Sequence, residues 1–395
     1  MIAQMSWEES VKTTTRMLTY IQGLPPHDVG GAQCLYNTRR LIGILSKVLL
    51  EIVKCSKENV EILKDKKNEI ECRQSEIQNS PEDFVPTDLR DTLYTEIRKV
   101  EVKKLTRSHT VCTSPQCSEV VGNERIFKQI CCDDCKGFIS TWTCKAFKGI
   151  SGATCRYCGC KRAKHEWRAT TTELTSEVLF DNTEEGIYKV LNRDDALRKL
   201  KDHCEKIEEK IAQMECERKQ MLEAGAMMSI FLEQKALVST ASTSDNLGSC
   251  LRNERDTYGH AVSNGVRQKM SKIEYGKERE KSVAAINKYI MGVTLCMENL
   301  NKLIDDYDKY YESARNSGKV YTMQDVHEMI DDLYKLPMDG KTLKVAVSEV
   351  KRCEKLAIED DHSANSFLIG KISKVWQAIK SKKQAVVSHL TDLIR

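Results

Sequence analysis

Residues 112–165 read Cys112-x4-Cys117, Cys131-Cys132-x2-Cys135, Cys144 and Cys155-x2-Cys158-x-Cys160-x4-His165, and they hold nine of the 17 cysteines in the sequence. A tetrahedral zinc ion takes four ligands, and each short loop in this stretch presents two soft ligands from one turn. Repeated cysteine pairs that close with a histidine are typical of zinc sites. The spacing predicts a small zinc-binding module with short β-strands at residues 106–180.

This stretch offers ten candidate ligands, whereas two zinc ions need eight. Our preferred set leaves out Cys132 and Cys144. Because Cys132-x2-Cys135 is an ordinary zinc-knuckle spacing, Cys132 remains an alternative to Cys131. The candidate ligands of the two predicted Zn²⁺ ions are Cys112, Cys117, Cys131, Cys132, Cys135, Cys155, Cys158, Cys160 and His165. The spacing leaves open whether the pairs coordinate in order or in an interleaved cross-brace.

The compartment of the protein bears on this interpretation, because thiols stay free in a reducing environment and form disulfides in an oxidising one. Residues 1–10 lack the basic and apolar regions of a signal peptide, and no run approaches the roughly 18 apolar residues of a membrane-spanning helix. We therefore expect a cytoplasmic protein. The odd total of 17 cysteines also fits poorly with a fully paired disulfide framework, which favours metal.

Apolar residues before and after the module recur at helical spacing among many charges. Before the module, the pattern predicts an N-terminal helix at residues 6–22, a long charged helix at about 37–76 and a short helix around 89–105. Inside the module the helical pattern vanishes. Apolar residues flank a turn at Gly122-Asn123, which predicts a β-hairpin, and the Thr-rich residues 166–178 predict a last strand.

Helical spacing returns after the module. The pattern predicts helices at residues 194–238, 266–311, 323–336, 340–358 and 363–393, with a Ser/Thr-rich loop at 239–249. Narrow apolar stripes must be buried or the helices fray, so we expect the helices before residue 105 to pack against those after 194. The alternative is a set of independent coiled coils that self-associate as a dimer.

These patterns predict a mainly α fold, a long antiparallel helical stalk or coiled-coil bundle with the zinc-binding module inserted in it. The predicted divisions are N-terminal helices at residues 1–105, the module at 106–180, stalk helices at 190–316 and a C-terminal helical segment at 320–395. The net charge of +4 is small for 395 residues, so any basic surface has to be local.

Motifs of the common catalytic sites are absent. The sequence has no G-x4-G-K-[ST] phosphate loop, no H-E-x-x-H, no G-x-S-x-G and no G-x-G-x-x-G. A zinc ion in a thiolate-rich shell is closed and electron-rich, which favours a structural role over a catalytic one. The sequence therefore predicts a non-enzymatic, zinc-stabilised interaction or scaffold protein with protein partners.

Three alternative interpretations remain. Basic residues near the end of the module are interleaved with aromatic ones, at Trp142, Phe147, Tyr157 and Trp167. Surfaces that bind single-stranded RNA use this mixture, although such rings more often fill the core of a small metal module. A cross-braced module could also make the protein a ubiquitin ligase, but the usual central loop with a Cys-x-His pair is missing. The predicted helix at 363–393 is amphipathic and basic, so it could lie on an anionic membrane or dock on neighbouring helices.

Further motifs flank the cysteine pairs, at Ser6-Trp7-Glu8-Glu9-Ser10-Val11, Leu24-Pro25-Pro26-His27 and Leu333-Tyr334-x-Leu336-Pro337 with Gly340-Lys341. Together with the cysteine signature they resemble the region that follows the G domain in a family of AIG1-like P-loop GTPase proteins. The resemblance implies a helical, zinc-binding tail that in that family is joined to an N-terminal nucleotide-binding domain. Three alternatives stay open for this chain: a truncated gene model, an isoform, or a partner of separate P-loop GTPases. No P-loop occurs here, so the resemblance does not extend to GTP binding or hydrolysis. Beside Cys131, where we expect that family to have a histidine, this chain has Cys132, which keeps position 132 open as a ligand.

Overall fold

The computed structural model describes residues 10, 12–17, 20, 29–81, 89–114, 116–121, 124–133, 135, 144–147, 154–179, 190–235, 246–273 and 279–352. The chain forms two compact units, Met1–Arg40 and Leu41–Arg395. In the first unit, residues 10, 12–17 and 20 are helical, which agrees with the helix predicted at 6–22. The rest of that predicted helix and the whole of the one predicted at 363–393 lie outside the described residues.

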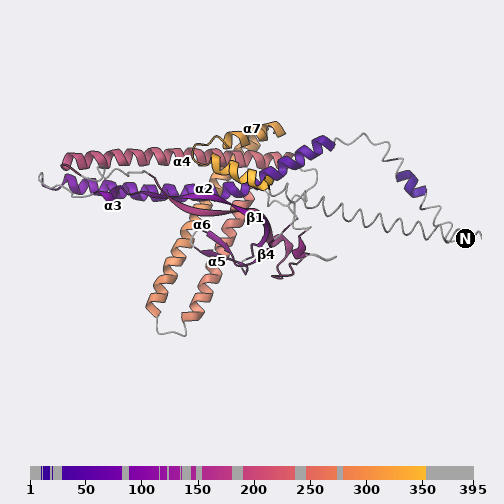
Figure 1. Cartoon of the computed structure of the whole chain (residues 1–395), viewed down its shortest axis with the longest axis horizontal. Helices are drawn as coiled ribbons and strands as arrows, with labels where there is room; N and C mark the ends of the chain where they lie inside the picture. The colour runs from indigo at the N-terminus through magenta and orange to yellow at the C-terminus, as the bar shows by residue number, and fades with distance from the viewer. Residues whose placement is uncertain are drawn as a thin grey trace, which may run out of the picture. The chain divides into compact units, whose positions relative to one another are not determined.

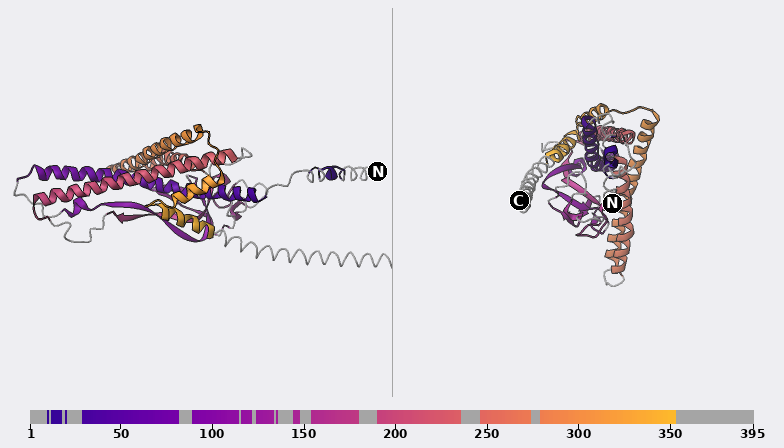
Figure 2. Two further views of the ribbon diagram at one scale, coloured as in Figure 1. Left: turned by 90° about the horizontal axis from the view of Figure 1, so that it is seen from above. Right: turned by 90° about the vertical axis from the view of Figure 1, so that its right-hand side faces the viewer.

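Two long helices build the main core of the second unit. Helix α2 (Val29–Gln78), whose residues from Leu41 on belong to this unit, lies antiparallel to helix α4 (Arg193–Lys235), as Figures 1 and 2 show. Buried residues fill the space between them: Val60, Leu63, Ile70 and Ile77 of α2 with Leu200, Ile207 and Met214 of α4. Lys67 and Glu208 form an ion pair across the contact at 2.6 Å. A helix from before residue 105 thus packs against one from after 194 within a single chain.

Three further helices contact α4. Helices α5 (Leu247–Ile273) and α6 (Arg279–Asn316) lie side by side in Figure 1, and α7 (Met323–Leu333) begins at a capping box formed by Thr322 and Asp325. The last described helix covers residues 340–352. Our prediction of one helical run over 266–311 was wrong, because it spans the end of α5 and the start of α6. Apolar spacing does not mark such an end when both helices bury a stripe of the same period.

The helix predicted around residues 89–105 was also wrong. Only Arg90–Leu93 (α3) is helical, and Glu96–Cys112 forms the 17-residue strand β1. Three buried residues are four positions apart, as on one face of a helix: Leu89, Leu93 and Ile97. The chain nevertheless extends, because the β-branched residues of β1 pair with a Thr-rich strand far along the sequence. Tertiary pairing outweighs the local pattern here.

β1 is the central strand of a three-stranded sheet with the order β4-β1-β5. Strand β5 (His165–Val178) pairs antiparallel with β1, from Glu96 opposite Val178 to Cys112 opposite His165, and the register is irregular between Lys104 and His109. Strand β4 (Ile130–Cys132) pairs only near the C-terminal end of β1. The strand predicted at 166–178 is therefore confirmed.

A separate two-stranded sheet lies between β1 and β4 in the sequence. Strand β2 (Ser118–Val121) pairs antiparallel with strand β3 (Glu124–Phe127), and Val121 lies opposite Glu124. This register confirms the hairpin that the sequence predicts around Gly122-Asn123.

One end of the β1–β5 pair, which we call the ribbon, is fixed to the helices. Asn59 of α2 donates from Nδ2 to the Arg98 carbonyl at 2.7 Å, and its Oδ1 accepts the Arg98 N–H at 2.9 Å. The Asn59 amide therefore satisfies the backbone of β1 as a neighbouring strand would. Just before β1, the hydroxyl of Thr95 lies 3.1 Å from Nε2 of His203 on α4.

The other end of the ribbon carries the cysteine-rich region. Trp167 of β5 packs against the buried cysteines, and Val350 packs against both Trp167 and Ile44 of α2. Lys47 of α2 forms an ion pair with Glu166 of β5 at 3.1 Å. The protein is thus mainly helical, with a small strand-containing, cysteine-rich region, as predicted. No helix among the described residues has the length and apolar character to cross a bilayer.

Candidate metal centre

The cysteine-rich region brings its potential metal ligands into three groups, and within each group all ligand atoms lie within 4.8 Å of one another. Group A consists of Cys112, Cys117, Cys158 and Cys160. Group B consists of Cys131, Cys155, Cys158 and His165. Group C consists of Cys132, Cys135 and Cys144. Each group could hold a metal ion, and together they contain all nine predicted ligands as well as Cys144.

Group A joins the C-terminal end of β1 to a loop at residues 154–161. Cys112 is the last residue of β1, and a turn follows in which the Cys117 N–H donates to the Ser114 carbonyl at 2.8 Å. The sulfurs of Cys117 and Cys160 are 3.8 Å apart. Two thiolates on one tetrahedral zinc ion, at Zn–S distances of about 2.3 Å, are separated by about 3.8 Å. This pair of sulfurs already has the spacing that zinc requires.

The loop at residues 154–161 is tight and carries three of the cysteines. The Cys155 N–H donates to the Cys160 carbonyl at 2.8 Å, and the Gly159 N–H donates to the Cys155 carbonyl at 2.9 Å. Gly159 has a φ of 72°, a left-handed conformation that costs a residue with a side chain about 1–2 kcal/mol. The Tyr157 N–H also points at the Cys155 sulfur, at 3.4 Å. The glycine therefore lets the chain turn sharply enough for the thiols to converge.

Group B combines three thiols with the imidazole of His165, the first residue of β5. Nδ1 of His165 lies 3.0 Å from the Lys161 carbonyl oxygen, so Nδ1 carries the proton and donates it. This leaves the lone pair of Nε2 for a metal ion, and Nε2 lies 3.2 Å from the Cys158 sulfur. The Phe147 ring packs edge-on against the imidazole. Burial lowers the pKa of His165, which favours the neutral form that binds metal.

Cys131 and Cys132 are neighbours in β4 but belong to different groups. Successive side chains of a strand point to opposite faces, so both thiols can bind metal, but they cannot bind the same ion. From the sequence, these two residues are alternatives for a single ligand position. In the structure, the strand assigns Cys131 to group B and Cys132 to group C.

Group C contains Cys144, which our preferred ligand set left out. It is buried together with Cys132 and Cys135, and its sulfur lies 3.4 Å from both the Ala146 N–H nitrogen and the Thr110 hydroxyl. The hydrogen bond from Cys135, followed by those from Thr110 and Ala146, lowers the pKa of Cys144 to about 5 against the effect of burial. Cys144 has no cysteine at short range in the sequence, so only the surplus of cysteines over eight ligands signalled it.

Three thiols of groups A and B hold their protons more strongly than an ordinary cysteine does. Burial raises the pKa of Cys112 and Cys131 well above the usual thiol range and that of Cys117 to about 11. A thiol must lose its proton before it binds a metal ion, so metal binding releases protons. The affinity of these groups for metal should therefore rise with pH.

The three groups are interleaved along the chain. The ligands of group C and the first two of group B lie between Cys117 and Cys158 of group A. The groups therefore do not follow the order of consecutive cysteine pairs along the chain. Folding of the region requires that residues about 50 positions apart come together.

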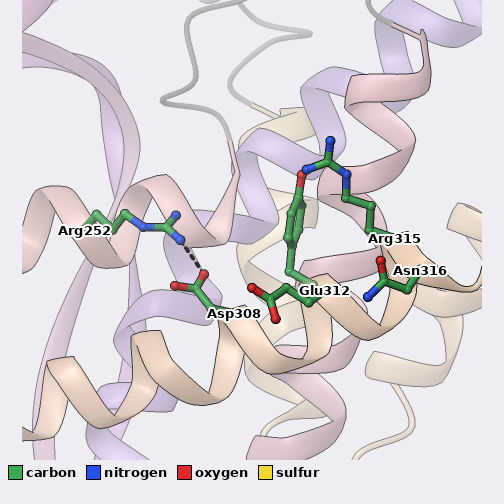
Figure 3. A pocket seen from close by; sticks show the side chains of 6 residues that line it. Arg252, Asp308, Glu312, Arg315 and Asn316 are labelled. Atoms are coloured by element: carbon green, nitrogen blue, oxygen red, sulfur yellow. Dashed lines mark hydrogen bonds and ion pairs between the residues drawn. The ribbon is translucent and has the colours of Figure 1, made fainter.

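A second feature is a hollow of about 480 Å³ on α5 and α6, shown in Figure 3. Arg252 and Asp308 form an ion pair there, and the remaining lining residues are Tyr311, Glu312, Arg315 and Asn316. The Tyr311 hydroxyl is engaged with the Glu233 carboxylate at 2.6 Å. Charges of both signs offset each other in this lining, and it offers neither a thiol nor an imidazole. The hollow therefore supports no catalytic assignment.

Comparison of the chain with models of protein families, with curated proteins and with solved structures finds no match.

Proposed function

We propose that this chain is a non-enzymatic interaction or scaffold protein whose cysteine-rich region is a structural zinc module. The observation that carries the proposal is the convergence of nine thiols and one imidazole into three groups of the size of a metal shell. Soft sulfur ligands at tetrahedral spacing favour zinc over the hard cations, which prefer oxygen. A thiolate-rich zinc shell is closed, so its role is structural.

The small core of this region supports a need for metal. Apart from cysteines, the described residues of its buried core are Ala146 and Phe147. Domains with so little apolar core are commonly stabilised by metal ions or disulfides. In such domains the free energy of metal binding is free energy of folding.

The helices give the module a position from which to bind a partner. α2 and α4 bury their own apolar core, which contains none of the metal-ligand groups, and would act as the stalk. Because the chain resembles the tail of AIG1-like proteins, the partners that we propose are P-loop GTPases. A binding titration of the purified chain with the GTP-loaded G domain of an AIG1-like protein tests this, and a dependence on bound zinc is expected.

The metal content of the purified full chain is the decisive measurement. We expect at least two zinc ions per chain in protein prepared under reducing conditions without chelator, measured by elemental analysis. Cys117→Ser should lower the zinc content, because Cys117 belongs to group A. Cys216→Ser is the matched control, since Cys216 is exposed on α4. Less than one zinc ion per chain, with the thiols still reduced, would contradict the proposal.

The proposal also predicts that the chain neither binds nor hydrolyses GTP. The sequence contains no P-loop, so no run of backbone amides with a lysine is available to hold the phosphates. A titration with a fluorescent GTP analogue in the presence of magnesium should show no saturable binding. Tight, magnesium-dependent binding would overturn this part of the proposal.

Binding of single-stranded RNA is a second candidate, favoured by one observation. Tyr157 is 62% exposed and is followed in the same loop by exposed Lys161. In contrast, Phe147 is buried and Trp167 packs against the cysteines, while Trp142 lies outside the described residues. A stacking surface needs several exposed rings, so the scaffold function is better supported. A salt-dependent affinity for single-stranded RNA that is lost in Tyr157→Ala would favour the alternative.

A further inference from the structure

Cys158 is a member of two groups at once. Its sulfur lies within 4.8 Å of the other ligand atoms of group A and also within 4.8 Å of those of group B. We propose that the centre binds three metal ions, two of which share the thiolate of Cys158. This inference rests on the proposed role of the region as a metal module and goes beyond the two ions that the spacing predicts.

The number of ligands favours the sharing. Groups A and B contain seven different side chains, whereas two separate tetrahedral ions need eight. A thiolate sulfur has more than one lone pair and can bind two ions, so a shared Cys158 gives each ion four protein ligands. Without sharing, one of the two ions would have only three. The protons displaced from the thiols pass to water.

The ribbon explains how one side chain reaches both ions. Cys112 and His165 lie opposite each other on β1 and β5, yet Cys112 belongs to group A and His165 to group B. The two shells therefore start from neighbouring positions. Cys158 belongs to both shells, and its sulfur is 3.2 Å from Nε2 of His165.

Sharing also limits the charge that the region has to accommodate. Two Zn²⁺ ions with the six thiolates of groups A and B carry a net charge of −2, and a seventh, separate thiolate would make it −3. Basic residues in and beside the loop at 154–161 offset part of this charge, at Arg156, Lys161, Arg162 and Lys164. The guanidinium of Arg162 lies over the ring of Phe147, which packs on His165.

Group C provides the third ion with a separate shell. Its three thiols are buried, and Cys132 points to the face of β4 opposite to that of Cys131 in group B. The Thr110 hydroxyl and the Ala146 N–H both lie within hydrogen-bond distance of the Cys144 sulfur, where they stabilise a thiolate. Group C therefore supplies three thiols to its ion, none of them from groups A and B, which is one protein ligand fewer than each of those groups supplies when Cys158 is shared.

A series of single substitutions in the full chain separates shared from unshared ligands. Native mass spectrometry of the wild-type chain should show three zinc ions. We expect Cys117→Ser, Cys131→Ser and Cys144→Ser each to lose one ion, because each residue serves one group. Cys158→Ser should lose two ions, and the exposed control Cys216→Ser should lose none. Loss of a single ion in Cys158→Ser would overturn the sharing.

A second measurement on the wild-type chain does not depend on any variant folding. When ¹¹³Cd replaces zinc, a shared thiolate couples two of the cadmium resonances through the Cys158 sulfur, and the resonance from group C should remain uncoupled. Three uncoupled resonances would overturn the sharing alone, and two coupled resonances without a third would overturn the ion of group C alone. A chain that binds no metal would contradict the proposed zinc module itself, which distinguishes the two failures.

Discussion

Asn59 is the residue that attaches the ribbon to α2. Its side chain is almost fully buried and serves both the N–H and the carbonyl of Arg98. In Asn59→Ala the Arg98 N–H loses this partner and the Arg98 carbonyl keeps only the weak thiol donor of Cys55 at 3.3 Å. We therefore expect the free energy of unfolding to fall by about 1–3 kcal/mol in urea denaturation followed by circular dichroism. Asn68→Ala, at an exposed position of the same helix, should change it by less than about 0.5 kcal/mol. Equal losses in the two variants would contradict this role of Asn59.

His203 makes the stability of the α2–α4 core depend on pH. Burial, followed by repulsion from Lys206 and Lys66, lowers its pKa from 6.5 to about 4. Below pH 6.5 the unfolded state takes up a proton that the folded state does not, so this group costs stability as the pH falls from about 6.5 to about 4 and has no effect above that range. The effect amounts to at most about 3 kcal/mol.

The measurement that isolates His203 is a comparison of the wild-type chain with His203→Gln, a residue that can still hydrogen-bond to Thr95. Asp339 acts in the opposite direction, because burial and then Glu217 raise its pKa to about 6, and the metal ligands also take up protons in acid. Both contributions are common to the two proteins. We expect the difference in unfolding free energy between them to shift in favour of His203→Gln between pH 7 and pH 4.5. A difference that is independent of pH would contradict the assignment.

At the residue scale, the sequence could predict which thiols lie together where the chain is local. Cys155, Cys158 and Cys160 lie in one tight loop, so their spacing alone marks them as candidate ligands. Cys144 reaches its group only through the tertiary fold, and the choice between Cys131 and Cys132 depends on the alternation of β4. The spacing of cysteines along the sequence contains neither the tertiary fold nor the direction in which each side chain of a strand points.

The contact between helices α5 and α6 depends on a glycine. A Cβ at Gly248 would lie 2.8 Å from Cζ of Tyr307, whose ring is buried and whose hydroxyl donates to Ser229 at 2.7 Å. Because this ring cannot move aside, Gly248→Ala should push the helices apart. We expect thermal unfolding to show a free energy of unfolding that is lower by about 1–3 kcal/mol. Gly292→Ala on α6 is the control, since a Cβ at this position would have no neighbouring atom within 4 Å, and it should gain up to about 1 kcal/mol. Stabilisation by both substitutions would contradict the close contact.

At the element scale, the long helices could be predicted because their pattern is repeated many times. α2 and α4 are each more than 40 residues long. α4 lies close to its predicted bounds, whereas α2 ends close to the predicted residue but begins at Val29, eight residues before the predicted start. β1 could not be predicted, because its N-terminal part shares a helical spacing with α3 and its partner β5 is far away in sequence. The two-residue alternation of a β-strand can be recognised here only when β1 and its partner strand β5 are considered together.

Two hydrophobic cores of different chemistry meet at the ribbon in the described part of the second unit. The first consists of aliphatic side chains from α2, α4 and the start of β1, and the second consists largely of cysteines. The sequence predicted both, the first from periodicity and the second from cysteine spacing. It did not predict the ribbon, which is the element that belongs to both.

Because the ribbon belongs to both cores, removal of metal should divide it. Residues 96–104 of β1 pair with 170–178 of β5 and are anchored by Asn59 and by the aliphatic core. Residues 109–112 pair with 165–168 beyond the irregular register, and Cys112 and His165 at the end of this pairing belong to the groups that could hold a metal ion. We expect a strong chelator to abolish the protection of 109–112 and 165–168 in hydrogen exchange measured by mass spectrometry, while 96–104 and 170–178 keep theirs. Addition of zinc should restore the lost protection. Uniform loss along the ribbon would mean that the metal centre and the helical core unfold as one unit, and no loss at either end would mean that metal does not stabilise this region.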